Sequence, residues 1–401
     1  MVTLTMGEKK KVEVIQMVMD GKMEVSGAGQ VLGRTVRTIY RLLARVRKRG
    51  LEGIIHGNRG NDHSKVYTDG IKEKILDMVR GKYRDINDTH LVELLQKNEG
   101  IKVSRQWLRL LLRGVGIKSK RKRRRPKYRS RRERKEAFGM MIQIDASDHD
   151  WLEGRGPKMI LVGGIDDATG FVWSHFEESE STWSYLRLVR QIVLSHGVPL
   201  SLYSDRHTIF YSPKEPTIIE QIQNIRPLTQ FGRAMKELNV ELIPAYSAPA
   251  KGRIEKLWNT FQDRLIVEMR LKGIKTRDEA NIFLQEFLKD YNERFTVPAR
   301  KKERVFSKRL PLWQLDRTLC LKETRVVQKN HTISFEGLVL QIPPSSKWAS
   351  IARQRVYVLQ LKDGSIEITY KNMIVARFRS PAILRLVKQH KLDSSQLLDA
   401  A

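Results

Sequence analysis

Apolar residues near the start of the chain recur every three or four positions, which is the spacing of an amphipathic helix. This pattern predicts three short helices, at Lys9–Met19, Ser26–Leu32 and Thr35–Arg47. A Gly33-Arg34-Thr35 turn joins the second helix to the third. Two short helices joined by a glycine-containing turn are typical of a helix-turn-helix. We therefore predict a helix-turn-helix domain over residues 1–60.

The third helix would present basic and polar side chains to the major groove of DNA. The candidate contacts are Arg34, Arg37, Thr38 and Arg41. A basic helical hairpin with no role in DNA binding is the alternative, because the pattern alone has little specificity.

The helical pattern continues up to residue 116. Helices are predicted at Ile71–Gly81, Thr89–Asn98 and Arg105–Gly114, with Asp88 and Ser104 as N-caps of the last two. We predict a second helix-turn-helix or winged-helix-like domain over residues 61–116.

The pattern changes in the middle of the chain, where short apolar runs alternate with helical segments. Strands are predicted at Met140–Asp145, Met159–Ile165, Phe171–Phe176, Leu200–Ser204 and Val240–Pro244. Helices are predicted at Thr182–Ser195, Thr229–Leu238, Gly252–Lys272 and Thr276–Tyr291. Three meandering strands followed by two helix–strand units is the order of the ribonuclease-H-like fold. We predict an α/β catalytic core of this fold over residues 137–298.

The last part of the chain alternates apolar and polar residues in short runs broken by Gly337, Pro343-Pro344 and Asp363-Gly364, which predicts β-strands. We expect a linker over residues 299–323, a small SH3-like β-barrel over 324–380 and a tail over 381–401. The complete chain is thus predicted to be a multidomain α+β protein with N-terminal helix-turn-helix units.

Charge points to a polyanionic partner. The 75 Lys and Arg against 45 Asp and Glu leave a net charge of +30. A basic linker is predicted over residues 117–136, and within it 13 of the 18 residues from Lys118 to Lys135 are basic. Its candidate phosphate contacts are Arg121, Arg123, Arg124 and Arg125. A solvated tether is the alternative, but DNA phosphates neutralised by such a run would release counterions.

Three carboxylates are candidates for catalysis. Asp145 and Asp205 each end an apolar strand, and Glu255 opens a helix. In the ribonuclease-H-like fold the first and fourth strands are adjacent, so these carboxylates can converge on two divalent cations, roughly 3.5–4 Å apart. Such a pair promotes in-line displacement at phosphorus.

Other residues near these carboxylates have weaker claims to a role. Asp148 and Asp150 fall in the turn predicted over His149–Pro157, and Asp166 and Asp167 fall in a hairpin turn. Glu241 and Asp263 are the alternatives to Glu255 as third ligand. Around Glu255, the candidate DNA contacts are Lys251, Arg253, Lys256, Asn259 and Gln262.

Several classes of protein are disfavoured. Cys320 is the single cysteine, so no intramolecular disulfide and no cysteine zinc site can form. A phosphate-binding loop of the Walker type is not evident. The chain contains no apolar run of about 18 residues and no leader pattern, so we expect it in the cytoplasm, associated with the nucleoid in a bacterial cell.

Six motifs resemble one known family. They are Gln143-Ile144-Asp145, Asp148-His149-Asp150-Trp151, Ile165–Gly170, Tyr203–His207, Thr229–Gly232 and Lys251–Glu255. Their order and spacing are similar to those of bacterial insertion-sequence transposases of the DDE class, in the group called ISNCY, with a retroviral-integrase-like core.

The resemblance implies a DNA transposase, a polynucleotidyl transferase whose metal-binding triad is Asp145, Asp205 and Glu255. It implies two Mg²⁺ or Mn²⁺ ions, 3′-end cleavage and strand transfer into target DNA. The implied partners are double-stranded DNA, as terminal inverted repeats and target, and further copies of the chain in a dimer or higher oligomer. Two rival functions are a regulator that binds DNA without cutting it and a nuclease that only hydrolyses, since one fold hosts several chemistries.

Overall fold

The computed structural model describes residues 4–55, 67–120, 132–216, 218–222, 227–245, 251–346 and 350–379. The chain divides into two compact units, Met1–Arg80 and Gly81–Ala401. Arg121, Arg123, Arg124 and Arg125, the candidate contacts of the basic linker, lie outside the described residues. No helix in the described part of the chain is long and apolar enough to cross a membrane.

The first unit contains the predicted helix-turn-helix. Its helices are α1 (Met6–Met19), α2 (Val25–Leu32) and α3 (Val36–Arg49), followed by the 3₁₀ helix η1 (Gly50–Ile54) and by α4 (Asp69–Arg80). Gly33 ends α2 with a φ of 58°, a left-handed conformation that glycine adopts at little cost. Ile15, Ala28 and Ile39 pack together and bury one side of each of the first three helices.

The second unit begins with helices α5 (Asp88–Glu99) and α6 (Arg105–Gly114). Ser104 caps α6 as predicted, because its hydroxyl accepts a hydrogen bond from the Trp107 amide at 3.1 Å. The sequence predicts Asp88 as the N-cap of α5, but the N-cap is Asn87. The Asn87 side chain accepts hydrogen bonds from the Thr89 and His90 amides, whereas Asp88 pairs with Arg113 at 2.7 Å.

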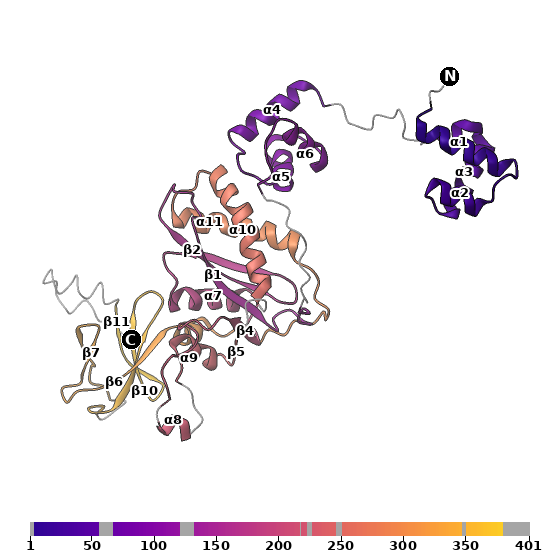
Figure 1. Ribbon diagram of the computed structural model, residues 1–401. Helices are drawn as coiled ribbons and strands as arrows, with labels where there is room; N and C mark the ends of the chain where they lie inside the picture. The colour runs from indigo at the N-terminus through magenta and orange to yellow at the C-terminus, as the bar shows by residue number, and fades with distance from the viewer. Residues whose placement is uncertain are drawn as a thin grey trace. The chain divides into compact units, whose positions relative to one another are not determined.

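A five-stranded sheet forms the centre of the second unit (Figure 1). Its strands are β1 (Ile142–His149), β2 (Met159–Asp166), β3 (Val172–Glu177), β4 (Ser201–Ser204) and β5 (Glu241–Pro244). Their order is β3-β2-β1-β4-β5. The first three strands are antiparallel, and β4 runs parallel to both β1 and β5. This topology confirms the predicted ribonuclease-H-like order.

Helices cover both faces of the sheet (Figure 1). α7 (Thr182–Ser195) and α9 (Gln230–Glu237) pack on one face, and α10 (Gly252–Leu271) and α11 (Arg277–Phe295) pack on the other. The short helix α8 (Ile218–Ile222) follows β4. A Cβ atom at Gly163 of β2 would meet the Trp258 ring of α10 at 2.7 Å. The absence of a side chain there therefore lets α10 approach the sheet closely.

The C-terminal part is β-rich, but the predicted barrel is not confirmed. After α12 (Leu312–Thr318) come β6 (Leu321–Val326), β7 (Thr332–Phe335), β8 (Leu338–Gln341), β9 (Arg355–Gln360), β10 (Ile366–Tyr370) and β11 (Met373–Phe378). The described strands form a four-stranded sheet in the order β11-β10-β9-β6 and a separate β7–β8 hairpin. Apolar side chains of β7, β8, β9, β10 and β11 share one core. The sheet stays open because its two edge strands, β6 and β11, do not pair with each other.

Candidate active site

Asp145 lies in the middle of β1, not at the end of a strand as predicted. The strand is longer because β2 pairs with it from Ile142 through His149, and Asp145 lies opposite Gly163. Asp148 therefore belongs to the strand, and its predicted place in a turn is wrong. Of the two aspartates predicted in this turn, Asp148 and Asp150, only Asp150 follows the strand.

Asp205 directly follows β4, as predicted. The parallel pairing of Ile142 with Leu202 and of Gln143 with Tyr203 fixes the register of β1 and β4. Asp145 and Asp205 each lie two residues beyond the paired residues Gln143 and Tyr203, so they are level with each other. Because side chains alternate along an extended chain, both are on the same face of the sheet. The tertiary structure thus brings two of the three candidate carboxylates together.

The amino group of Lys251 bridges these two carboxylates. Its Nζ atom lies 2.8 Å from Oδ1 of Asp145 and 3.6 Å from Oδ2 of Asp205. The other oxygen of Asp145 accepts a hydrogen bond from the indole nitrogen of Trp258 at 3.1 Å. Lys251 is only 8% exposed, so its ammonium group is buried beside the two carboxylates.

Glu255 lies in the first turn of α10, as predicted, and is exposed. It sits on the helix between Lys251 and Trp258, which both contact Asp145. Positions four and three residues apart share a helix face, so Glu255 belongs to the side of α10 that borders the carboxylate pair. In the described part of the chain, no three His, Cys, Asp or Glu side chains are grouped closely enough to hold a metal ion.

The other candidate contacts on α10 differ in their surroundings. Arg253 is half-buried, with its Nε atom 2.7 Å from Asp167 Oδ1. The Gln262 amide reaches the Ser147 hydroxyl at 3.4 Å, and the Asn259 amide donates to the Glu255 carbonyl at 2.8 Å. Lys256 is exposed.

Asp166 has the turn role that the sequence predicts. It accepts hydrogen bonds from the Thr169 amide at 2.7 Å, from the Thr169 hydroxyl and from the Gly139 amide. Burial raises the pKa of Asp166, although these hydrogen bonds oppose the shift.

Asp167 has a larger role than the turn predicted from the sequence. This fully buried carboxylate accepts hydrogen bonds from the Gln143 amide at 2.9 Å, from the Lys135 main chain at 2.8 Å, from Arg253 and from Arg132. A pair of aspartates directly after an apolar strand was the only signal for it in the sequence.

The residues predicted to read DNA lie on or just before α3. Arg34, Arg37 and Arg41 are exposed, and Thr38 is half-buried. The Thr38 hydroxyl is 3.0 Å from that of Thr35, the N-cap residue of α3. Tyr40, which the sequence pattern does not single out, is 59% exposed on the same helix.

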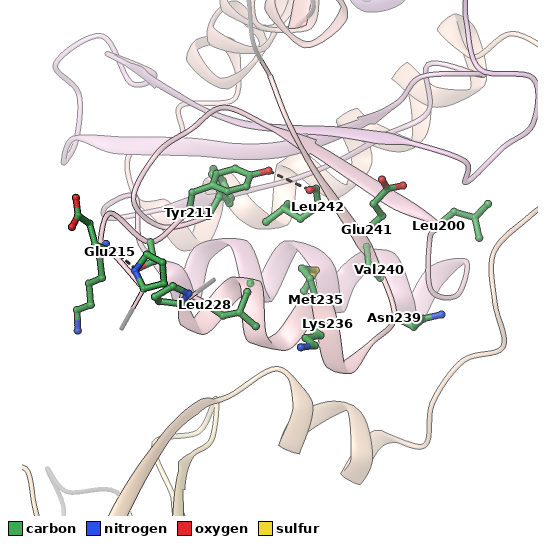
Figure 2. Close-up of a pocket in the computed structure, with 16 residues that line it drawn as sticks. Leu200, Tyr211, Glu215, Leu228, Met235, Lys236, Asn239, Val240, Glu241 and Leu242 are labelled. Atoms are coloured by element: carbon green, nitrogen blue, oxygen red, sulfur yellow. Dashed lines mark hydrogen bonds between the residues drawn. The ribbon is translucent and has the colours of Figure 1, made fainter. Parts of the chain in front are cut away.

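A pocket of about 780 Å³ lies apart from the carboxylate pair, between α9, β5 and the segment after β4 (Figure 2). Tyr211 crosses it and donates to the Leu242 carbonyl at 3.3 Å. Glu241 lines this pocket. It pairs with Ser201 at the start of β4, the opposite end of the strand from Asp205. Asp263, the other alternative third ligand, contacts Asn87 and Lys120.

The strand order β3-β2-β1-β4-β5 defines a ribonuclease-H-like core. Comparison with known proteins agrees with the helix-turn-helix predicted at the N-terminus. Residues 5–55 match the family of homeodomain-like domains. Among solved structures, the catalytic core domain of HTLV-2 integrase in complex with magnesium matches at 14% identity, over 41% of this chain and 94% of that one, with a TM-score of 0.31. The catalytic core domain of BIV integrase matches at 18% identity, over 39% and 85% of the two chains, with a TM-score of 0.28.

Two relatives that align with most of this chain show the family. A protein of Sinorhizobium fredii (strain NBRC 101917 / NGR234), which bears the transposase name y4bF, is 34% identical over 92% of this chain and 80% of its own length. The transposase for insertion sequence IS1202 of Streptococcus pneumoniae is 30% identical over 92% of this chain and 85% of its own length. The chain belongs to the family of insertion-sequence transposases.

Proposed function

We propose that this transposase is a DDE-type polynucleotidyl transferase that cuts the 3′ ends of its transposon and joins them to target DNA. The observation that carries the proposal is the placement of Asp145 and Asp205 side by side with a cation between them. Glu255, on the adjoining face of α10, is the third member of the proposed triad.

The donor set fits Mg²⁺ or Mn²⁺. Hard cations take carboxylate oxygens, and Mg²⁺ is commonly held by one or two carboxylates together with water and substrate phosphate. Asp145 and Asp205 supply two carboxylates that already share one positively charged partner. When bound, two such ions would supply the charge that stabilises the attacking and leaving oxygens of an in-line displacement.

The chain's own residues would orient the donors and the DNA. Trp258 holds Asp145 in one orientation through its indole N–H, which reduces the reorganisation needed when substrate arrives. Asp167 anchors the first turn of α10 through Arg253 and so positions Glu255. Lys256 and Asn259, exposed beside Glu255, would contact DNA phosphates.

The partners follow from the same proposal. The helix-turn-helix unit would bind terminal inverted repeats of double-stranded DNA through Arg34, Arg37, Thr38 and Arg41. Two or more copies of the chain would hold the two ends together, in the cytoplasm and on the nucleoid. The linker arginines Arg121, Arg123, Arg124 and Arg125 would bind phosphates.

Substitution of each triad residue tests the chemistry directly. Inverted repeats found in the DNA flanking the gene supply the substrate, and cleavage and joining are measured with labelled ends. In Asp145→Asn, Asp205→Asn and Glu255→Gln we expect both steps to fall by roughly 10²–10³-fold, the cost of losing one charge-stabilising group. A mobility shift of the same ends should persist, because other parts of the chain bind them.

Asp148→Asn is the matched control, since Asp148 is an exposed carboxylate on the same strand as Asp145. It should retain activity. Joining of pre-cleaved ends by Glu255→Gln at the wild-type rate would remove Glu255 from the triad. End binding without cutting by the wild-type protein would favour the regulator instead.

A further inference from the structure

Lys251 occupies an unusual position for a basic residue in a protein that binds DNA. It is the N-cap residue of α10 and is 8% exposed, and its amino group points into the site, not toward solvent. Nζ contacts Asp145 at 2.8 Å and Asp205 at 3.6 Å. A lysine that served only to hold phosphates would be expected on the surface, as Lys256 is.

The electrostatics of the carboxylate pair explain this position. Two carboxylates placed side by side repel each other, which disfavours the charged form of both. A lysine ammonium is a compact charge on a flexible stem, so it can neutralise both carboxylates and can also move away. Arg253, two residues along the chain, cannot substitute for it because its own side chain is paired with Asp167.

The ammonium and a divalent cation would compete for the same two carboxylates, because two positive charges held there repel each other. Mg²⁺ binds carboxylate oxygens at about 2.0–2.1 Å, and the ammonium donates directly to Oδ1 of Asp145. A divalent ion held by Asp145 and Asp205 would therefore weaken the contact between Nζ and Oδ1 of Asp145.

We propose that Lys251 is an internal counter-ion that competes with divalent cations for Asp145 and Asp205, so that it sets the metal affinity of the free protein. The inference rests on the proposed metal-dependent function. It assigns Lys251 a positioning role, which is to keep the two carboxylates together before the metal arrives.

Calorimetric titration of the full-length chain with Mn²⁺, without DNA, tests the competition. Lys251→Met removes the ammonium and keeps a side chain of similar length. We expect it to bind Mn²⁺ about tenfold more tightly than the wild type, because the competing charge is gone. Lys251→Arg keeps a cation and should stay within about threefold of the wild type.

Lys256→Met is the matched control, because it removes one positive charge from the same helix without touching the carboxylates. Its Mn²⁺ affinity should change by less than about threefold, since exposed charges are screened. Equal affinities of Lys251→Met and the wild type, with binding still lost in Asp145→Asn, would overturn this inference and leave the metal site standing. Binding that does not depend on Asp145 in either background would overturn the proposed metal site as well.

Thermal unfolding separates competition from a purely structural role. Without metal, Lys251→Met should melt below the wild type, because the carboxylates have lost their counter-ion. Saturating Mn²⁺ should raise its melting temperature more than that of the wild type. A variant that is destabilised and gains no more from Mn²⁺ than the wild type would show that Lys251 is only structural.

Discussion

Asp167 is a single buried carboxylate that ties three parts of the core together. Its donors come from Gln143 on β1, from Lys135 before that strand and from Arg253 on α10. Asp167 is fully buried, whereas its partners Arg253 and Arg132 are partly exposed, so its removal leaves two guanidinium groups without their acidic partner.

We therefore predict that Asp167→Asn lowers the free energy of unfolding by about 1.5–3 kcal/mol, the range for loss of a hydrogen bond to a charged group. Denaturant unfolding followed by tryptophan fluorescence measures the loss. Asp148→Asn, at an exposed position on β1, should cost less than about 0.5 kcal/mol. Equal stabilities of the two variants would contradict the anchoring role.

At the residue scale, the local sequence pattern predicts the identity of the candidate carboxylates but not their exact place in the fold. Asp145, Asp205 and Glu255 can be selected from the sequence because each borders an apolar run with strand or helix periodicity. The place of Asp145 within its strand cannot, because the pairing of β2 along residues 142–149 extends β1 beyond the apolar residues.

At the scale of elements, α10 links the proposed catalytic residues to helix α5. Arg264 of α10 forms two hydrogen bonds with Glu93 of α5, at 2.6 and 3.1 Å, and Arg294 of α11 adds a third at 2.7 Å. His90 and Glu268 are 3.1 Å apart in the same interface. Burial raises the pKa of Glu93, but hydrogen bonds and charges from the two arginines outweigh it and lower the pKa to about 2.

This lowered pKa predicts how docking of α5 depends on pH. Glu93 is ionised in the folded state at pH values where it would be protonated when unfolded, so its contribution is complete above about pH 4.5 and is lost as the pH falls toward about 2. Glu93→Gln should destabilise the protein by about 1–3 kcal/mol at pH 7 and remove this part of the acid sensitivity. Thermal unfolding at pH 7 and pH 3 measures both effects.

Glu286→Gln is the control for that experiment, since Glu286 is an exposed carboxylate on α11. It should change neither the stability nor its pH dependence. A Glu93→Gln variant with wild-type acid sensitivity would show that this ion-pair cluster does not hold α5.

Helix α3 carries the prediction for sequence recognition. Arg37→Ala and Arg41→Ala should each weaken binding to the terminal repeats by about 1–3 kcal/mol, because a bidentate contact with a base edge is lost. Binding to unrelated DNA should change little. Lys10→Ala, at an exposed position on α1, is the control and should leave the preference intact in a competition mobility shift.

At the scale of the whole molecule, some of the basic side chains are already paired with other groups of the protein and are not available to bind DNA. Within the basic run, Lys120 lies 3.5 Å from Asp263, Arg134 donates to the Ala168 carbonyl at 3.0 Å, and Arg132 pairs with Asp167. The ends of the run therefore already contact acidic or carbonyl groups of the protein.

Because the ends of the basic run contact the protein itself, we expect the DNA contacts of the run at Arg121, Arg123, Arg124 and Arg125. If each neutralises one phosphate, changing all four to Gln should lower the slope of log affinity against log salt by roughly 3–4 units. The variant with all four changed to Lys preserves the charge and should keep the slope. An unchanged slope in the Gln variant would mean that these arginines belong to a solvated tether.

Much of the architecture follows from the sequence because helix and strand periodicities are local. The apolar spacing of residues 182–195 alone predicts α7 with its observed bounds, and the meander of three strands followed by two helix–strand units predicts the sheet order. The cap of α5 was misplaced by one residue, because Asn87 and Asp88 are both good capping residues and only the backbone conformation distinguishes them.

The tertiary structure alone decided the features that depend on partners distant in the sequence. Whether the C-terminal strands close into a barrel depends on hydrogen bonds between β6 and β11, and strand periodicity carries no information about such pairing. The contact of Lys251 with Asp145 joins residues 106 positions apart. Composition and motif indicated which residues are candidates for chemistry on DNA, but only the packing of α10 on the sheet placed a lysine ammonium between two of the carboxylates, because a counter-ion stabilises like charges that lie side by side.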